Sequence, residues 1–462
     1  MTYWVGIQPG MSVLVCGIGI SGTAAARWLV GQGARARVVD ERHGPDEQVT
    51  AATLESLGVV VSLGPGAAGG DDLGDADLIV TSPGWRPDHP LLRAAADRGV
   101  PVWSEVELVW REQEPGVPEW LAVTGTNGKT TTTEMLAAML GAAGIPGGAA
   151  GNIGRPLVEA AWDGIYPEPQ ILAVELSSFQ LHWSETISPR AGALLNLADD
   201  HLDWHGSFAA YAAAKAKIWG ADGTTVAIFN ADDSRVVSLL GDRPGVGCTL
   251  GEPSSGQLGV RDGVLVDRAF GHGKLLSADQ LQVRGAHNVA NALAASALAL
   301  AGDVPVDAVR QALGGFTTGA HRNVVVAEID GVRYVDDSKA TNPHAAGASL
   351  AAYDEIVWIA GGLNKGLSFD DLVRGAADRL CAVVLIGRCA PELRDALARH
   401  APDVPVHDAA DLQTAVQVAQ GLAHAGDVVL LAPAAASMDM FRDYAERGDV
   451  FAAAARALGG PR

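Results

Sequence analysis

The sequence has few of the features that mark secreted, metal-stapled or membrane-embedded proteins. Its four cysteines are too few and too scattered for a disulfide framework or a zinc site. Cys16 and Cys381 lie in apolar, strand-like runs and are expected to be buried free thiols, as in a reducing cytoplasm. No run of about 18 apolar residues occurs, so no membrane-spanning helix is expected. A glycine motif and Arg27 interrupt residues 11–29, which argues against a secretory signal.

Positive charge is also scarce. The chain has 33 Lys and Arg against 54 Asp and Glu, which gives a formal net charge of −21. We therefore expect no general affinity for nucleic acid or for anionic membranes. An anionic ligand must instead be held by helix N-termini, glycine-rich loops and a few placed basic side chains. No period of about 20–50 residues recurs, so solenoids and propellers are not expected.

At about 150 residues per domain, a chain of 462 residues predicts three domains. Strand-like and helix-like segments alternate nearly throughout, which predicts an α/β fold with parallel sheets. We expect a Rossmann-like N-terminal domain, a central P-loop ATPase-type domain and a Rossmann-like C-terminal domain. The proline-rich stretch 112–118 and the glycine-rich stretch 314–320 place their limits at 1–115, 116–319 and 320–462.

A first glycine motif, Gly17-x-Gly19-x-x-Gly22, lies between a predicted strand and a predicted helix, and Asp40 ends the next predicted strand. In this context backbone N–H groups at a helix N-terminus bind a diphosphate. A nicotinamide dinucleotide is the simplest interpretation, and a plain strand-to-helix turn is the alternative. The motif by itself does not say which diphosphate binds.

A second motif, Gly125–Thr131, follows the predicted strand 120–124 and precedes a predicted helix. Small residues let the backbone wrap phosphate oxygens, Lys129 is placed to neutralise them, and the Thr130 hydroxyl is placed for Mg²⁺. Val123 stands where the general P-loop has its first glycine. We predict that the loop binds a nucleoside triphosphate. A chain with both a diphosphate site and a triphosphate site favours a reaction in which ATP cleavage drives the conversion of another substrate, rather than hydride transfer.

Acidic side chains follow two later strands. Glu175 ends the predicted strand 171–175, at a position typical of a Mg²⁺ ligand. Three Asp residues and His201 follow the next strand between positions 199 and 203. They indicate either a metal site or helix N-caps. We expect His201 to be functional and at least one Asp to serve only as a cap.

Two further pairs are ambiguous from spacing alone. Lys215 and Lys217 lie in an alanine-rich helical stretch, where solvated lysines are the simplest interpretation. Asn288 and Asn291 lie three residues apart on one helix face. They would either contact an adenine edge or cap the helix, and the sequence favours neither.

Basic side chains mark the predicted strand ends of the third domain. Arg322, Lys339 and Lys365 each lie beside Gly, Ser or Asn loop residues, and Ser437 follows a third strand. Because ligands of open α/β sheets bind at the carboxyl ends of strands, these residues indicate an anionic ligand. Solvated loop lysines are the alternative.

In this combination the sequence resembles the Mur ligase family, and most closely its D-glutamate-adding members. The resemblance covers essentially the whole chain, and Asp337–Asn342 is its most discriminating motif, whereas the Asp-Asn-Pro-Arg motif of the diamino-acid-adding members is absent. The motifs that carry it are Gly17–Gly22, Ser82–Gly84, Gly125–Thr131, Gly151–Gly154, Glu175–Gln180, Asp200–His201, Tyr211–Lys215, His287–Asn291, His321–Arg322, Asp337–Asn342, Gly361–Lys365 and Ser437.

The resemblance implies a monomeric cytoplasmic enzyme of peptidoglycan precursor synthesis. It would use ATP and two Mg²⁺ ions to join D-glutamate to UDP-N-acetylmuramoyl-L-alanine through an acyl phosphate. A related amide ligase with a different substrate, or a nicotinamide-binding protein, is the alternative. Family members carbamylate the lysine that matches Lys215, so the resemblance makes this residue a metal ligand although its spacing does not.

The resemblance also implies site residues. The catalytic residues would be Lys129, Glu175, His201 and Lys215, and the metal ligands Thr130, Glu175, His201 and carbamylated Lys215. ATP would be bound by Gly125, Thr126, Asn127, Gly128, Lys129, Thr130, Thr131, Asn288, Asn291, Arg322 and Asp337. The UDP-sugar would contact Gly19, Ser21, Gly22, Glu41, Arg42, Ser82, Gly84, Asn152 and His201. D-Glutamate would contact Lys339, Thr341, Lys365, Ser437 and Tyr444. Glu41, Asn323 and Tyr444 depart from the residues usual in the family.

Overall fold

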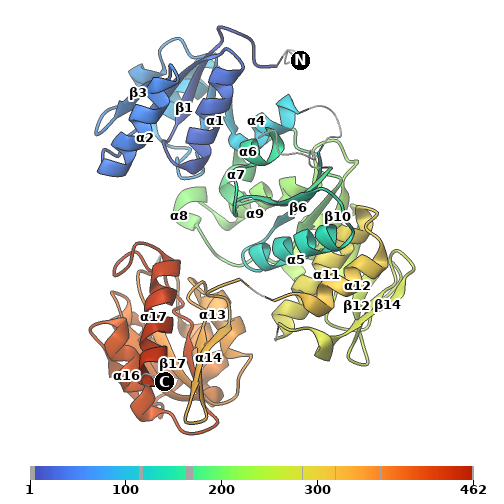
Figure 1. The fold of residues 1–462 in the computed structure, drawn as a ribbon, viewed down its shortest axis with the longest axis vertical. Helices are drawn as coiled ribbons and strands as arrows, with labels where there is room; N and C mark the ends of the chain where they lie inside the picture. Colours follow the sequence, from blue (N-terminus) through green and yellow to red (C-terminus); the bar gives the residue numbers. More distant parts are fainter. Residues whose placement is uncertain are drawn as a thin grey trace. The chain divides into compact units, whose positions relative to one another are not determined.

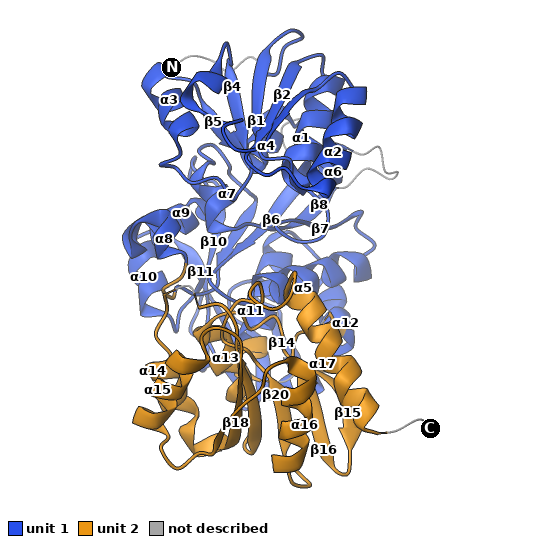
Figure 2. Cartoon of the chain, turned by 90° about the vertical axis from the view of Figure 1, so that its left-hand side faces the viewer, with its two compact units in different colours: residues 1–197, 201–281, 290–315 blue, residues 198–200, 282–289, 316–462 orange. Residues whose placement is uncertain are grey.

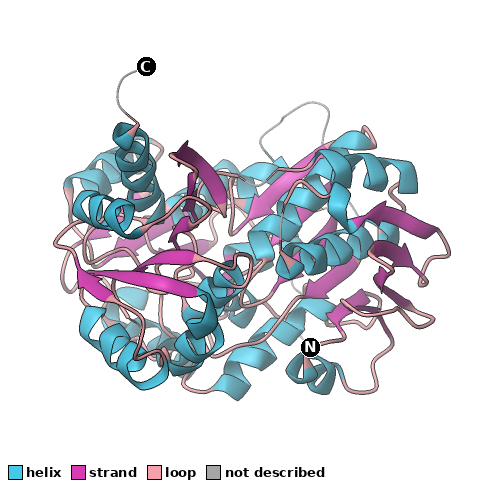
Figure 3. Ribbon diagram, turned by 90° about the horizontal axis from the view of Figure 1, so that it is seen from below, coloured by secondary structure: helices cyan, strands magenta, loops and turns pink. Residues whose placement is uncertain are grey.

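The computed structural model describes residues 6–113, 118–162, 170–283, 285–317, 319–364 and 366–459. Within these residues the strands form three sheets, and helices flank them (Figures 1 and 3). The chain divides into two compact units (Figure 2). Unit 1, which comprises residues 1–197, 201–281 and 290–315, holds the first two sheets. Unit 2, which comprises residues 198–200, 282–289 and 316–462, holds the third.

The first sheet has five parallel strands in the order β3-β2-β1-β4-β5. Its strands are β1 (Ser12–Cys16), β2 (Arg35–Asp40), β3 (Val60–Leu63), β4 (Leu78–Thr81) and β5 (Val102–Ser104). Its helices are α1 (Ile20–Gly31), α2 (Pro45–Ser56), α3 (Pro90–Arg98) and α4 (Glu105–Glu112). The strand order reverses between β1 and β4, so the glycine motif after β1 lies at the switch point, where such sheets bind ligands.

The second sheet has nine strands in the order β14-β13-β12-β11-β10-β9-β6-β8-β7. Its strands are β6 (Glu119–Thr124), β7 (Gly147–Gly151), β8 (Ile171–Glu175), β9 (Ala191–Leu194), β10 (Val226–Asn230), β11 (Gly245–Cys248), β12 (Gln257–Arg261), β13 (Val264–Asp267) and β14 (Gly273–Ser277). Its helices are α5 (Lys129–Ala142), α6 (Leu157–Trp162), α7 (Ser178–His182), α8 (Leu202–His205), α9 (Phe208–Ala216), α10 (Ser234–Leu240), α11 (Ala286–Ala301) and α12 (Val306–Gly315). The pairs β12–β13 and β13–β14 are antiparallel, so this edge departs from the predicted parallel sheet.

The third sheet has the order β15-β16-β20-β17-β18-β19. Its strands are β15 (Val324–Ile329), β16 (Val332–Asp336), β17 (Ile356–Gly361), β18 (Leu380–Ile386), β19 (Val406–Asp408) and β20 (Val428–Leu431). Its helices are α13 (Pro343–Leu350), α14 (Asp370–Ala376), α15 (Ala390–His400), α16 (Leu412–Leu422) and α17 (Tyr444–Leu458). Strands β15 and β16 pair antiparallel and form a hairpin around Asp330 and Gly331.

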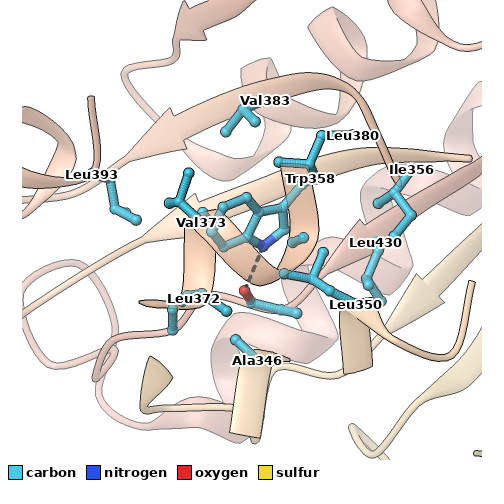
Figure 4. Packing of buried hydrophobic residues seen from close by; sticks show 14 of the residues in the cluster. Ala346, Leu350, Ile356, Trp358, Leu372, Val373, Leu380, Val383, Leu393 and Leu430 are labelled. Atoms are coloured by element: carbon cyan, nitrogen blue, oxygen red, sulfur yellow. Dashed lines mark hydrogen bonds between the residues drawn. The ribbon is translucent and has the colours of Figure 1, made fainter. Parts of the chain in front are cut away.

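The core of the third sheet is packed around an indole ring. Trp358 on β17 is fully buried and packs among aliphatic side chains that include Leu350, Val373 and Leu393 (Figure 4). Its Nε1–H donates to the carbonyl oxygen of Ala432 at 2.7 Å. The buried donor is therefore satisfied, as a buried indole requires.

The cysteines match the sequence interpretation only in part. Cys16 is buried in β1, but Cys381 in β18 is exposed, and both are free thiols. The register of β18 against β17 shifts at this point: Leu380 pairs with Ile356 and Ala382 with Val357. Cys381 is the extra residue of this irregularity, which explains how it escapes burial. Among the described residues, no helix has the length and apolar character needed to cross a bilayer.

Candidate functional site

The P-loop connects β6 to α5, as the sequence predicts. Gly128 is the N-cap of α5 with φ +83°, and a Cβ there would lie 2.3 Å from Oδ1 of Asn291. Lys129 Nζ donates to the carbonyl oxygens of Gly125 and Thr126, each at 3.0 Å. The ammonium group is therefore held over the loop, where it can neutralise phosphate oxygens.

Asn196, which sequence reasoning did not assign, braces this loop from the end of β9. Its Oδ1 accepts from the Asn127 N–H at 2.8 Å, and its Nδ2 donates to the Asn127 carbonyl at 3.0 Å. Its own carbonyl accepts from the Thr126 N–H at 3.0 Å. Because β9 pairs with β6, the first polar residue after β9 lies beside the loop after β6. That strand adjacency was the only sequence signal for Asn196.

Glu175 presents a carboxylate oxygen with unused hydrogen-bonding capacity. It ends β8, where it pairs with Val123 of β6, and only 2% of its surface is exposed. Its Oε1 accepts from Asn152 Nδ2 at 2.8 Å, whereas its Oε2 is buried without a hydrogen-bond partner. An isolated buried carboxylate oxygen is costly, and a divalent cation would satisfy it.

Among the described residues, no group of three or more His, Cys, Asp or Glu side chains is arranged to hold a metal ion. That result is compatible with Mg²⁺, which usually takes one or two protein ligands and completes its shell with phosphate oxygens and water. The Thr130 hydroxyl, in the first turn of α5, and Glu175 fit that pattern.

Lys215 contradicts the simple interpretation of a solvated lysine. It is 2% exposed, and its Nζ donates to the Gly125 carbonyl at 2.8 Å and to Thr124 Oγ1 at 3.3 Å. The same Nζ lies 4.9 Å from the ring centre of Tyr211, whose hydroxyl is 2.8 Å from Thr126 Oγ1. Helix α9 therefore turns this lysine toward the P-loop.

Lys217 is not simply solvated either. Its Nζ donates to the carbonyl oxygens of His182 and Ser184, each at 2.8 Å. The lysine therefore closes the end of α7. This role is structural, in contrast to the position of Lys215.

His201 is the N-cap of α8 and has a left-handed conformation, with φ 53°. Its ring lies edge-on to Phe179, with 4.7 Å between the centroids. In the same cluster, burial lowers the pKa of His182 and of His205 to about 4. His205 Nε2 is 3.0 Å from Ser178 Oγ. The segments after β8 and β9 are thus packed together next to Glu175.

The first glycine motif is sterically required. A Cβ on Gly17, which has φ +103°, would lie 2.6 Å from Ser82 Oγ, and a Cβ on Gly22 would lie 1.9 Å from the Gly17 carbonyl oxygen. Asp40 accepts from the Ile18 N–H at 2.9 Å. Burial favours a raised pKa for Asp40, but its hydrogen bonds, chiefly from Arg42, outweigh burial and lower it.

Two strand ends therefore meet at the switch point of the first sheet. The motif residues Gly19, Ser21 and Gly22 follow β1, and Ser82 and Gly84 follow β4. Asp40 fixes the loop backbone and pairs with Arg42 at 2.7 Å, so its carboxylate is already engaged within the protein.

In unit 2, the loops after β16 and β20 are joined by a buried arginine that sequence reasoning missed. Arg447 is 1% exposed and donates to the Ser338 carbonyl at 2.8 Å and to the Ala435 carbonyl at 3.2 Å. Burial lowers its pKa to about 10. Lys339 Nζ donates to the Tyr444 hydroxyl at 3.2 Å. The structure thus brings these two candidate D-glutamate residues together.

The remaining candidates are placed as follows. Arg322 lies between two residues with positive φ, His321 (63°) and Asn323 (55°). Asp337 is buried and accepts a hydrogen bond from Ser349, and burial raises its pKa to about 6. Asn288 and Asn291 are both buried, with Asn291 next to Gly128. Thr341 and Ser437 lie in the loops after β16 and β20, and Glu41 is exposed after β2. Lys365 lies outside the described residues.

Three family models match the chain in succession. The MurD-like N-terminal domain of Mur ligases matches residues 11–104, the Mur ligase middle domain residues 123–299, and the Mur ligase glutamate ligase domain residues 321–435. The UDP-N-acetylmuramoylalanine–D-glutamate ligase of Frankia casuarinae is 59% identical over 98% of this chain and 95% of the relative. The enzyme of the same name from Streptomyces avermitilis is 52% identical over 99% and 100%.

Solved structures show the same fold. The UDP-N-acetylmuramate–alanine ligase of Thermotoga maritima superposes with a TM-score of 0.60 at 22% identity, and covers 97% of this chain and 100% of its own. MurF from Acinetobacter baumannii gives a TM-score of 0.56 at 18% identity, over 93% and 88%. At such identities the likeness concerns the fold alone.

Proposed function

The chain belongs to the Mur ligase family, and we propose that it joins D-glutamate to UDP-N-acetylmuramoyl-L-alanine with cleavage of ATP. The reaction would be a step of peptidoglycan precursor synthesis in the cytoplasm, carried out by a monomer. The relatives at 52% and 59% identity over nearly the whole chain support this substrate pair. The observation that carries the reaction class is the P-loop with the buried, unpartnered Oε2 of Glu175 beside it.

A carboxylate is a poor acyl donor because an oxide would have to leave. We propose that the alanyl carboxylate attacks the γ-phosphoryl group of ATP, which forms an acyl phosphate and releases ADP. Lys129 neutralises charge on the transferring oxygens. The amine of D-glutamate then attacks the acyl carbon, loses its proton, and forms the amide as phosphate leaves. Exclusion of water protects the acyl phosphate in between.

Magnesium fits the P-loop site for two reasons. The buried Oε2 of Glu175 lacks a hydrogen-bond partner, and the Thr130 hydroxyl lies in the first turn of α5, directly after the P-loop. The bound ion would supply additional positive charge for the phosphate oxygens. A second ion at His201 and carbamylated Lys215 is part of the proposal. The buried amine of Lys215, next to the P-loop, supports that role.

The three substrates would be held at three sets of strand ends. The diphosphate of the UDP-sugar would lie at the Gly17–Gly22 loop, with Ser82 and Arg42 nearby. Arg322 and Asp337 would contact the nucleoside of ATP. Lys339, Thr341, Lys365, Ser437 and Tyr444 would hold D-glutamate, and the contact between Lys339 and Tyr444 supports a shared role.

The test is phosphate release from ATP and Mg²⁺ with UDP-N-acetylmuramoyl-L-alanine. D-Glutamate would be present, absent, or replaced by L-glutamate or a diamino acid. Release only with the sugar nucleotide and D-glutamate together would support the proposal. Release with another amino acid would point to a different member of the family. If no pairing is active even with added bicarbonate, which favours lysine carbamylation, the proposed reaction is wrong.

Lys129→Ala should abolish turnover, because the γ-phosphoryl group loses its fixed cation. The readout is the amount of amide product, measured by chromatography. An unchanged thermal unfolding transition would show that the variant is folded. Appreciable amide synthesis by this variant would contradict the role of the P-loop.

A further inference from the structure

Two polar side chains in the segment after β4 lie directly against the glycine motif that follows β1. The strands β1 and β4 pair in parallel, so the loops that follow them meet at one edge of the first sheet. A Cβ on Gly17 would lie 2.6 Å from Ser82 Oγ and 3.0 Å from Nε1 of Trp85. The hydroxyl of Ser82 and the indole nitrogen of Trp85 therefore face the same point of the glycine motif.

Neither of these two groups has a hydrogen-bond partner within the part of the chain that the structure describes. Ser82 Oγ is buried without one, and the indole N–H of Trp85 also makes no hydrogen bond. Next to them, Gly19 is the N-cap of α1 and provides no side-chain cap for the first turn of the helix. An indole nitrogen can only donate, and backbone N–H groups at a helix N-terminus favour anions. The set of donors therefore fits a ligand rich in acceptor oxygens, such as a diphosphate.

The indole ring of Trp85 is fixed in this position. Its body packs against the apolar cluster of the first sheet that includes Cys16 and Leu91. Its backbone N–H donates to the Ser82 carbonyl oxygen at 3.2 Å. The ring of His89 stands edge-on to it, with 4.6 Å between the centroids and 65° between the planes. The N–H is thus held at the glycine motif before any ligand binds, which lowers the entropy cost of binding.

His89 is itself oriented through both of its ring nitrogens. It is the N-cap of α3, and its Nδ1 accepts from the Leu91 N–H at 3.3 Å. The neutral ring therefore carries its proton on Nε2. That nitrogen lies 3.5 Å from Oε1 of Glu41, which follows β2. Glu41 and His89 together keep the indole of Trp85 in place.

We propose that Trp85 is a further substrate-contacting residue of the sugar-nucleotide site: its indole N–H donates to an oxygen of the UDP group at the Gly17–Gly22 loop, beside the Ser82 hydroxyl, and His89 positions the indole. This inference rests on the proposed function, which places UDP at that loop. Because the UDP group does not react, loss of the contact weakens binding of the sugar nucleotide and leaves kcat unchanged.

The experiment uses Trp85→Phe in the full-length enzyme, because phenylalanine keeps an aromatic ring and removes the donor. We expect the Kd for UDP, measured by calorimetry, and the KM for UDP-N-acetylmuramoyl-L-alanine to rise about tenfold, the size of one lost hydrogen bond to a charged group. The KM values for ATP and D-glutamate and the kcat should stay near wild type. Saturating UDP should change the tryptophan fluorescence of the wild type more than that of Trp85→Phe.

Trp183→Phe is the matched control. Trp183 packs against the same apolar cluster of the first sheet, and its Nε1 is also buried without a hydrogen-bond partner. The first turn of α4 holds the segment that carries it, because Ser104 Oγ lies 2.9 Å from Ser184 Oγ and the Glu107 carboxylate accepts from the Glu185 N–H at 2.9 Å. We therefore expect this variant to fold, to bind UDP as the wild type does and to keep the full fluorescence change.

A double-mutant cycle tests the role of His89. His89→Asn keeps an N-cap acceptor for the Leu91 N–H and removes the ring that contacts the indole. If His89 acts through Trp85, the double variant should bind UDP no more weakly than Trp85→Phe alone. Additive losses would overturn the positioning role of His89.

Three results would overturn the contact between Trp85 and UDP. They are wild-type affinity for UDP in Trp85→Phe, an equal loss in Trp183→Phe, and a wild-type enzyme that does not bind UDP. A uniform rise of all three KM values would also contradict it, since that pattern indicates a general structural defect. A wild-type enzyme that binds UDP but joins no D-glutamate would refute the proposed function, and the UDP affinities of the two tryptophan variants would still decide the role of Trp85.

Discussion

At the scale of single residues, Gly128 carries two constraints at once, its positive φ and the nearby Asn291. Gly128→Ala should lower kcat/KM for ATP by about 100-fold or more, because the loop must distort to accept the methyl group. Steady-state kinetics with varied ATP is the measurement. Gly141→Ala is the matched control, since Gly141 lies near the exposed C-terminal end of the same helix with no atom within 4 Å of its added Cβ.

The control should retain full activity and gain up to about 1 kcal/mol of stability, because alanine favours a helix. If Gly128→Ala kept wild-type kcat/KM for ATP, the close approach to Asn291 would not matter for catalysis.

The histidines of the Phe179 cluster predict a pH dependence. His182 and His205 have folded pKa values of about 4, below the usual 6.5, so the unfolded chain binds more protons between these pH values. The contribution of these two neutral rings to the free energy of unfolding should be fully present above pH 6.5. The free energy of unfolding should therefore fall as the pH drops toward 4. Urea unfolding at several pH values would measure it.

Replacing both histidines with glutamine should reduce this slope, since glutamine does not titrate. A slope identical to wild type would mean that the two rings are not buried as described. Asp337 acts with the opposite sign, because its pKa is raised from 3.8 to about 6 and its contribution is lost as the pH rises through 6.

The residues that could be found from the sequence are those whose type alone determines their chemistry. Glycines with a lysine and a threonine after a strand indicate phosphate binding wherever they occur. The phosphate-binding role of Gly125–Thr131 could therefore be predicted from the sequence. Burial is different, because it depends on segments that are distant in sequence. From its spacing alone Lys215 was therefore interpreted as solvated, and only the family resemblance assigned it to the site. Arg447, which joins two loops of the third sheet, was not noticed.

At the scale of elements, the third sheet offers a direct test of packing. Trp358→Phe removes the donor to Ala432 and leaves a buried carbonyl without its partner. We expect a loss of about 1–3 kcal/mol in the free energy of unfolding of unit 2. Urea unfolding followed by circular dichroism is the measurement.

Val325→Thr is the control for this substitution. Val325 lies on the edge strand β15 and is 50% exposed, so its replacement should change stability by less than about 0.5 kcal/mol. Equal losses in both variants would indicate that Trp358 is not a central packing residue.

Elements with regular apolar runs were predictable, and elements without them were not. The strand β8 was predicted at its observed bounds, Ile171–Glu175. The strand β7 has the sequence Gly-Gly-Ala-Ala-Gly, which has almost no β propensity and forms a strand only because β8 pairs with it. The antiparallel strands β12 to β14 were not predicted, because glycine and charged residues break or end their apolar runs.

At the scale of the whole molecule, the division into two units predicts two unfolding transitions. The candidate nucleotide residues come from both units: Lys129 belongs to unit 1, and Arg322 and Asp337 belong to unit 2. A non-hydrolysable ATP analogue with Mg²⁺ should therefore raise both transition temperatures in scanning calorimetry. A shift of the first unit alone would place the nucleoside contacts entirely within unit 1.

The bonds made by the first turn of α4 bear on the modularity of such chains. Recombination between relatives is easiest where few specific contacts cross a boundary. Here Ser104, Glu105 and Glu107 depend on partners in the Val158 and Ser184–Thr186 segments, which belong to the second sheet and its helices and loops. A chimera that exchanges only the N-terminal domain would bury acceptors and donors that no longer match. The Val158 and Ser184–Thr186 segments would have to be exchanged together with the N-terminal domain. The part of the chain that can be transferred between relatives is therefore larger than the first sheet and its helices.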